Sequence, residues 1–345
     1  LITKNKHIMK KIFVAMLALA AATACSNDEL VSVNQEAIGF DNAFINNSVR
    51  SVNDPSYTDT NLFADFAVYG YVEGATLFDG VTVSKSITNS ELKSDWKYAG
   101  TQYWIAGANY NFHAVAPQTA GGWTATEKAA DGLKLNYTNN GTTDVLYATV
   151  AQQGLLEGNP QVAFTFRHVL SKVKFSFENA YNATNATIKV KNIKIENAYS
   201  TGSVALATNT TTWNAHNGVL ELDFGMATDA EETDAKENVE VAYAYPKVYE
   251  SQKELFLIPG AMPTDGYKVT FDVDLLVSGT SVKVFNHTVY AKFTPAVGNA
   301  YDIKAVINAE NIDPEHAQEP IEFTVNTLPG WGETIPVDDE QVNVM

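Results

Sequence analysis

Six histidines are the residues of this chain best suited to metal binding or acid–base chemistry, and their spacing favours neither. They stand at positions 7, 113, 168, 216, 287 and 316, and none falls in the H-E-x-x-H or H-x-E spacing that brings metal ligands together. The sequence also has no G-x-S-x-G nucleophile turn, phosphate-binding loop or G-x-G-x-x-G dinucleotide motif. We therefore predict no enzyme, no cofactor and no metal. A hydrolase built from two carboxylates on distant strands remains a minor alternative.

His113 and His168 are the two histidines that fall inside apolar runs, next to Phe112 and Arg167. They could meet across a β-sheet and share a proton. A lone strand histidine beside aromatic residues is more often a hydrogen-bonded structural side chain, and that is the interpretation we favour.

The single cysteine, Cys25, has the surroundings of a lipidation site. Lys10 and Lys11 precede an apolar stretch, Ile12 to Ala22, that is too short to span a bilayer comfortably. Small residues, Ala22-Thr23-Ala24, stand directly before the cysteine, which resembles a bacterial lipobox. We predict that residues 1–24 are a signal peptide and that Cys25 carries a lipid, which anchors the chain by about 0.8 kcal/mol per buried methylene. An ordinary secretory signal is the alternative.

The charges of the chain indicate its location in the cell and the classes of partner that it repels. Ser26 to Glu29 is similar to the acidic export signal that takes Bacteroidetes lipoproteins to the outside of the outer membrane. The formal net charge is −17, and the predicted leader holds four lysines and no acidic residue, so the charge from Cys25 onward is −21. Such a surface repels nucleic acid and anionic lipid, so we expect no nucleic-acid partner.

The rest of the chain has the sequence pattern of an all-β protein. Short apolar or aromatic runs alternate with clusters of Asn, Gly, Thr and Asp at intervals of about ten residues, which is typical of β-sandwiches. From Lys172 to Phe177 the alternation is strict and predicts a half-buried antiparallel strand. Ser90 to Tyr98 could form a short helix capped by Ser90. The other predicted strands are Phe66–Val72, Tyr110–Val115, Ile188–Ile195, Val239–Tyr245, Tyr267–Val277 and Val282–Phe293.

A length of 345 residues is sufficient for two β-sandwiches, and we place their join near the turn-rich segment Gly154 to Pro160. Several ordered strings then identify a family. They are Trp96–Pro117 with its internal Tyr103-Trp104, Asp144–Ala148, Val162–Phe177, Leu255–Gly260, Tyr301–Ile303, Ile321–Val325 and Trp331.

Together these strings resemble the fimbrillin family of Bacteroidetes, the pilins and pilin-like lipoproteins of type V pili. The resemblance runs from about residue 31 to residue 331. It implies two tandem transthyretin-like β-sandwich domains after a lipoprotein signal peptide.

The resemblance also implies a proteolytic step. Family members are exported as lipidated precursors and are cut after an arginine by a trypsin-like or arginine-specific protease. The matching bond here joins Arg50 to Ser51, in a polar segment suited to cleavage; an ordinary loop arginine is the alternative. The cut would release the first strand, in which Ile38, Phe40 and Phe44 share a face. The open groove would then accept a strand from a neighbouring subunit, which is donor-strand exchange.

The C-terminal tail is the possible donor strand. Ile335 and Val337 share one face, and Val342 and Val344 share the other, so a bulge or bend near the acidic triplet Asp338–Glu340 is needed to align all four. If the tail is too short or too acidic to serve as donor, the protein would occupy a tip or base position or would act outside pili.

These expectations divide the chain into five segments: a signal peptide (1–24), a lipidated propeptide with the first strand (25–50), an N-terminal β-sandwich (51–158), a C-terminal β-sandwich (159–331) and the tail (332–345). We expect a structural and adhesive subunit of a surface pilus, or fimbrium. Its expected partners are other pilin subunits in a homo- or hetero-polymer, outer-membrane lipid through Cys25, a processing protease, and a receptor on a host or bacterial surface.

The alternative from another class is a monomeric, surface-exposed carbohydrate-binding lipoprotein. Exposed aromatic side chains would then stack on sugars, and the candidates are Trp96, Trp104, Trp123 and Trp213.

Overall fold

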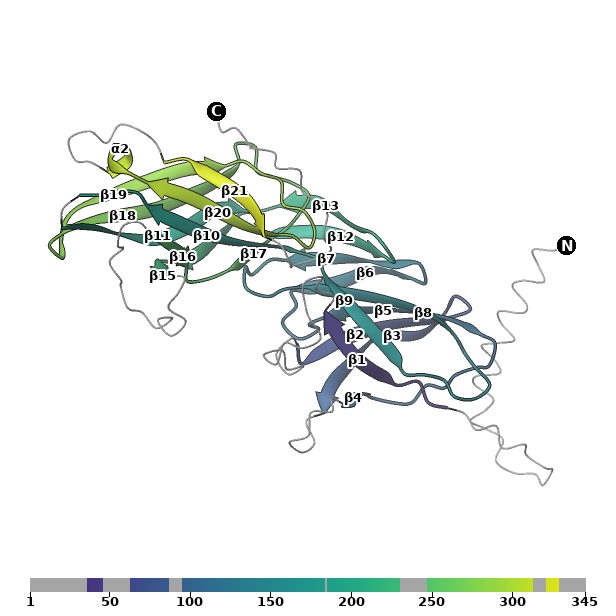
Figure 1. Ribbon diagram of the computed structural model, residues 1–345. Coiled ribbons are helices and arrows are strands. Elements are labelled where there is room, and N and C mark those ends of the chain that lie inside the picture. Colours follow the sequence, from purple (N-terminus) through teal and green to yellow (C-terminus); the bar gives the residue numbers. More distant parts are fainter. Residues whose placement is uncertain are drawn as a thin grey trace, which may run out of the picture.

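The computed structural model describes residues 36–45, 63–86, 95–183, 185–229, 247–312 and 321–328. Within these residues nearly all regular structure is β-strand, and the one helix is the four-residue α2 (Ala309–Ile312). The predicted all-β fold is therefore confirmed. Figure 1 shows the strands in two groups that follow one another along the length of the molecule. None of the described helical structure is long and apolar enough to cross a membrane.

The first group is a closed front barrel in the order β1-β4-β3-β2-β5-β8-β9. The first strand, β1, closes the barrel, because it pairs with β4 in antiparallel orientation and with β9 in parallel orientation. The strands are β1 (Phe40–Ile45), β2 (Asp65–Val72), β3 (Ala75–Ser86), β4 (Asp95–Tyr98), β5 (Asn109–Ala116), β8 (Leu146–Gln153) and β9 (Val162–His168).

A second sheet, here called the shared sheet, contains one hairpin from each half of the chain, in the order β13-β12-β7-β6. Its central strands β7 and β12 pair antiparallel from Thr138 opposite Thr201 to Gly132 opposite Ala207. Backbone hydrogen bonds therefore join the two halves directly. The four strands are β6 (Trp123–Ala129), β7 (Gly132–Thr138), β12 (Thr201–Ala207) and β13 (Thr211–Asn217).

The second group is a back sandwich of two sheets, β15-β16-β10-β20-β21 with β17 also paired to β10, and β14-β11-β18-β19. Inward side chains of both sheets, including Phe175, Phe177, Phe271 and Phe323, form one fully buried core. The strands are β10 (Ser171–Asn179), β11 (Ala186–Ala198), β14 (Leu220–Gly225), β15 (Ala227–Asp229), β16 (Val248–Ser251), β17 (Leu255–Leu257), β18 (Tyr267–Val277), β19 (Thr280–Ala291), β20 (Ala300–Ile307) and β21 (Phe323–Leu328).

Strand β10 shows how alternation builds this core. Val173, Phe175 and Phe177 are fully buried and Lys172 and Lys174 on the other face are partly exposed, as predicted, but Ser176 on that face is buried. The predicted antiparallel pairing is correct only in part, because β10 is antiparallel to β16 and β17 but parallel to β20. Alternation reports which face of a strand is buried, and it does not report the direction of the neighbouring strand.

The other predicted strands appear as β2, β5, β11, β18 and β19, and Val239–Tyr245 lies outside the described residues. The predicted short helix is wrong where it can be compared, because Asp95–Tyr98 forms β4 and pairs with β3. Trp96 and Tyr98 are aromatic residues that fit a pleated surface, and this packing outweighs the helical pattern.

The division into two domains remains a prediction. Gly154 to Pro160, the predicted join, lies between β8 and β9, which are both strands of the front barrel. The chain leaves that barrel after His168 and enters the back sandwich at Ser171.

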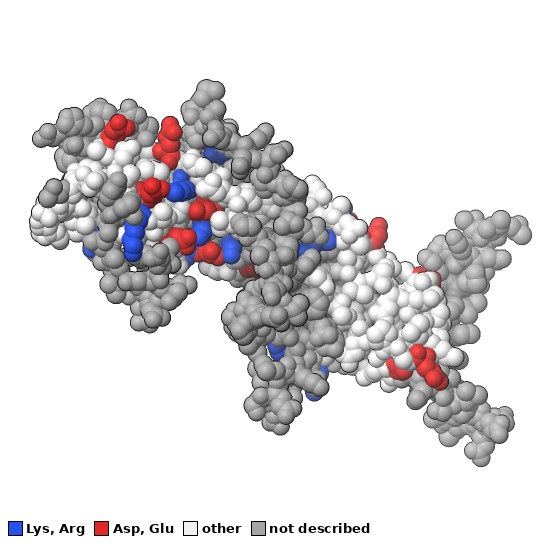
Figure 2. All heavy atoms as spheres, in the orientation of Figure 1, with Lys and Arg blue, Asp and Glu red and all other residues white. Residues whose placement is uncertain are grey.

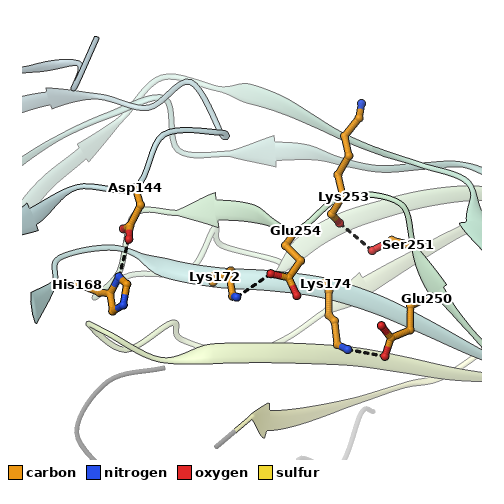
Figure 3. Close-up of polar contacts among 8 residues, drawn as sticks. All are labelled: Asp144, His168, Lys172, Lys174, Glu250, Ser251, Lys253 and Glu254. Atoms are coloured by element: carbon orange, nitrogen blue, oxygen red, sulfur yellow. Dashed lines mark hydrogen bonds and ion pairs between the residues drawn. The ribbon is translucent and has the colours of Figure 1, made fainter. Parts of the chain in front are cut away.

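Polar contacts near this crossing hold the outer face of β10 (Figure 3). His168 lies 2.5 Å from Asp144, Lys172 pairs with Glu254 at 2.6 Å and Lys174 pairs with Glu250 at 2.5 Å. The two lysine pairs are partly exposed, and such ion pairs contribute little, about 0–1 kcal/mol each. Figure 2 shows Lys, Arg, Asp and Glu interleaved on this side of the back sandwich. The core, and not surface charge, is therefore the main source of stability.

Candidate functional site: the first strand and its groove

The segment around β1 closes the front barrel and fills its centre. Ile38 and Phe40 are 1% and 3% exposed. The Ile38 N–H donates to the Gln102 carbonyl at 2.8 Å, the Tyr98 hydroxyl donates to the Ile38 carbonyl at 2.8 Å, and Val162 N–H donates to the Gly39 carbonyl at 2.8 Å. This short stretch is therefore hydrogen-bonded on both edges.

Phe40 lies at the centre of an aromatic cluster contributed by five other strands. Its ring stacks on Phe164 of β9 at 5.9 Å between centroids and meets four further rings edge-on at 5.5 to 6.3 Å. Edge-to-face and offset aromatic pairs contribute about 0.5–1.5 kcal/mol each beyond their buried area. The four edge-on rings are those of Phe66, Phe78, Tyr98 and Phe112.

The pairing of β1 with β9 contains one register shift. Phe40 is opposite Val162 and Ile45 is opposite Phe166, both buried in β9, but the register shifts between Asp41 and Phe44. Phe44 is opposite Thr165, an exposed residue. Ile38 and Phe40 are both buried, and the side chain of Phe44 lies outside what the structure describes, so a common face for all three stays a prediction.

Glu36, just before β1, sits in a cradle of nitrogen donors that sequence reasoning missed. Its carboxylate accepts from Gly158 N–H at 2.7 Å, Asn159 N–H at 2.6 Å and the Asn159 Nδ2 amide at 2.7 Å. These bonds, with the Asn159 backbone contributing most, lower the pKa of Glu36 below its ordinary value. The cradle therefore ties the start of the first strand to the loop between β8 and β9.

The predicted site residues outside β1 cannot be placed. Cys25, Arg50, Ser51 and the tail residues Ile335, Val337, Val342 and Val344 all lie outside the described residues. The lipidation site, the processing site and the donor strand therefore remain predictions.

The tryptophans suggested for sugar stacking are mostly in the core. Trp96, Trp104 and Trp213 are 8%, 6% and 9% exposed, and Trp123 is half-buried with its Nε1–H bonded to the Pro117 carbonyl at 2.8 Å. A ring that stacks on a sugar must present a free face to solvent. The burial of three of the four therefore argues against this set as a carbohydrate platform.

His113 and His168 have separate partners. The His113 ring bonds the Tyr147 hydroxyl at 2.7 Å and the Ala130 carbonyl at 3.1 Å, and His168 bonds Asp144. Both histidines are buried, as expected for structural side chains. No group of three or more His, Cys, Asp or Glu that could hold a metal occurs among the described residues.

Protonation of His113 is expected to destabilise the front barrel in mild acid. Burial lowers the pKa of His113 below its ordinary value of 6.5, so the unfolded chain binds the proton first. Stability should therefore be lost as pH falls from about 6.5 towards the lower folded-state pKa. The urea midpoint should fall between pH 7.5 and pH 5.5, and this fall should be larger for the unaltered chain than for His113→Gln. An equal fall in both proteins would contradict this assignment.

Comparison with known proteins identifies the chain's family. A family model described as fimbrillin-like matches residues 55–327, and a search of curated proteins finds no match.

Solved structures are similar to this chain over most of its length, at low identity. A Bacteroides uniformis protein provisionally described as a cell adhesion protein is 14% identical, with 86% of this chain and 98% of that chain covered and a TM-score of 0.46. A protein of similar description from Bacteroides ovatus is 15% identical (88% and 99% covered, TM-score 0.48). The fimbrial anchor protein Mfa2 from Porphyromonas gingivalis is 13% identical (87% and 100% covered, TM-score 0.33). The match over residues 55–327 spans most of the sequence, and by it the chain belongs to the fimbrillin-like family.

Proposed function

We propose that this chain is a structural and adhesive subunit of a cell-surface pilus, exported as a lipoprotein, processed by proteolysis and assembled by donor-strand exchange. Family membership supports the pilus role. The observation that carries the assembly mechanism is the position of β1. It is the first described strand, it fills the core of the front barrel, and it precedes Arg50.

The pairings of β1 suit a strand that can be exchanged. On one side it has a parallel ladder with β9, and parallel pairing is slightly weaker per residue than antiparallel pairing. On the other side its ladder with β4 is the single pair Phe40 opposite Trp96. Burial of Ile38 and Phe40 also holds this segment, and apolar side chains of another strand could replace it.

The connection after β1 determines what a cut would do. β1 ends at Ile45 and β2 begins at Asp65, so cleavage after Arg50 falls in the link between them. The released segment, 25–50, would carry both β1 and the lipidated Cys25. One cut would therefore open the groove and free the body of the protein from its lipid anchor.

The groove would be apolar and bordered by free backbone groups. Removing β1 uncovers Phe164 and Phe166 of β9 together with Phe66 and Phe112. Unpaired strand edges beside an apolar cleft favour addition of another strand. Other pilin subunits are the proposed source, with a processing protease and a surface receptor as further partners at the outer membrane.

Limited trypsin treatment tests this function on the full chain. We expect release of a peptide that ends at Arg50, followed by a ladder of oligomers on gels. Arg50→Gln should block both the cleavage and the ladder. A clipped protein that loses residues 25–50 yet stays monomeric would contradict donor-strand exchange and would favour a monomeric surface lipoprotein.

A further inference from the structure

The loop between β8 and β9 has the geometry of an anion-binding loop. Gly158 has a φ of +72°, in the left-handed region that glycine adopts without strain. With this turn, two successive backbone N–H groups, those of Gly158 and Asn159, converge on one carboxylate, and the Asn159 Nδ2 amide adds a third donor. Concave groups of donors of this kind bind anions, and here the anion is the side chain of Glu36.

The loop fixes these donors by its own hydrogen bonds. The Asn159 side chain accepts from Leu155 N–H at 2.7 Å through Oδ1 and donates from Nδ2 to the Leu155 carbonyl at 3.0 Å. At the base of the loop, Gly154 N–H donates to the Ala108 carbonyl and Gly107 N–H donates to the Gly154 carbonyl, both at 2.8 Å. Because none of these bonds involves residues 36–45, the first strand occupies the cradle without supporting it.

Glu36 attaches the start of the first strand to two loops. Its carbonyl accepts from Trp104 N–H at 3.0 Å, and its carboxylate lies in the cradle of the β8–β9 loop. Two residues later, Ile38 donates to the Gln102 carbonyl and is 1% exposed. The carboxylate is therefore fixed directly beside the first buried side chain of the barrel.

The cradle bonds differ from the other contacts of this strand in what can replace them. Apolar side chains of an incoming strand could take over the burial of Ile38 and Phe40. The three hydrogen bonds of the Glu36 carboxylate have to break when the strand leaves. Hydrogen bonds to an ionised acceptor are about twice as strong as neutral ones, so these three oppose release of the strand.

We propose that Glu36 and the Gly158–Asn159 cradle form a latch that retains the first strand in its own barrel and slows its release after the cut at Arg50. The latch rests on the strand exchange proposed above and assigns control of that exchange to one carboxylate. While the latch is closed, the chain's own strand blocks the groove, which makes it an autoinhibitory contact. The competing role for Glu36 is to stabilise the β8–β9 loop and not the strand.

Release of the strand from the clipped full chain tests the latch. In a Cys25→Ala background the chain is cut after Arg50, and size-exclusion chromatography follows dissociation of the freed segment. Glu36→Gln should raise the dissociation rate about three- to tenfold, because charge-assisted bonds become neutral at a site where solvent weakens the difference. Glu157→Gln, the matched control, makes the same charge change in the same loop and should leave the rate within about twofold.

An exchange of the two side-chain types tests whether Glu36 acts through the cradle. Asn159→Asp retains the acceptor for Leu155 N–H but places a second carboxylate beside Glu36, so the strand should be released faster than in Glu36→Gln. Combining Asn159→Asp with Glu36→Gln restores an amide–carboxylate pair with the roles reversed. The double variant should therefore release the strand more slowly than Asn159→Asp alone.

Hydrogen exchange in the uncut chain separates the latch from the loop. In Glu36→Gln, the amides of Ile38 and Trp104, which hold the start of the strand, should exchange about three- to tenfold faster. The amides of Gly107 and Gly154, which hold the base of the loop, should exchange at unchanged rates. Faster exchange confined to the loop amides would assign Glu36 to the loop and overturn the latch.

The outcomes distinguish the latch from the function on which it depends. Equal release rates for the unaltered and Glu36→Gln proteins, with oligomers formed by both, would overturn the latch and leave strand exchange standing. Faster release from Glu36→Gln, with every clipped protein remaining monomeric, would support the latch and overturn the proposed assembly. Clipped protein that retains the segment in every variant would overturn both.

Discussion

Phe40→Ala is expected to lower the free energy of unfolding of the front barrel by about 3–5 kcal/mol in the uncleaved chain. Phe40 is 3% exposed and contacts five aromatic rings from β2, β3, β4, β5 and β9, so truncation leaves a cavity at the point where the barrel closes. Chemical denaturation followed by the fluorescence of the buried Trp96 and Trp104 measures the change.

Two further variants test whether the loss of stability comes from the cavity that Phe40→Ala leaves. Tyr290→Ala removes a ring that is 41% exposed on β19, and we expect a change within about 0.5 kcal/mol. Phe40→Leu retains most of the apolar volume and should lose well under half of what alanine loses. If Phe40→Ala were as mild as Tyr290→Ala, β1 would not be an essential part of the barrel core, and its removal could not open a groove.

Trp213→Ala is expected to weaken the connection between the two halves by about 3–5 kcal/mol. Trp213 of β13 is 9% exposed, packs edge-on against Tyr137 of β7 at 5.7 Å, and donates from Nε1 to the Val169 carbonyl at 2.9 Å. Trp213 therefore connects hairpin β12–β13 of the back half to β7 of the front half. It also connects that hairpin to the segment between β9 and β10. We expect one cooperative unfolding transition in the unaltered chain and two separate transitions in the variant.

A further variant separates the contribution of the Trp213 hydrogen bond to stability from that of its ring. Trp213→Phe retains an aromatic ring but loses the donor, which leaves the Val169 carbonyl short of one partner and should cost about 1–3 kcal/mol. Calorimetry and guanidinium unfolding of the three proteins provide the comparison. A single, unshifted transition in Trp213→Ala would show that the β7–β12 pairing alone couples the halves.

For a pilus subunit the shared sheet has a mechanical consequence. Tension along a filament would have to shear the β7–β12 ladder together with its buried side chains before the halves could separate. Separate sandwiches on a flexible linker would instead part with little resistance.

The strand pattern was largely predictable from sequence because it is a local property. In β10, β18 and the centre of β11, alternating apolar residues face the core, and their neighbours along the strand carry the polar face. Trp96 to Tyr98 was mistaken for part of a helix, because nothing local reveals that β3 supplies a partner edge there.

The candidate site was predictable only in part. Alternation predicts that Ile38 and Phe40 share a buried face, and both are buried, but the register shift between Asp41 and Phe44 depends on β9, more than a hundred residues away in the chain. Glu36 was missed for the same reason, since its donors come from Gly158 and Asn159.

By itself the sequence of this protein determined the all-β class, most strand positions and the family resemblance, because each depends on residue types at short, regular spacing. Tertiary structure alone decided that β1 closes a barrel beside β9, that a cradle captures Glu36 and that one sheet joins the two halves. Strand pairing satisfies identical backbone groups at every residue, so the choice of partner and register depends on the packing of distant side chains, which no local pattern contains.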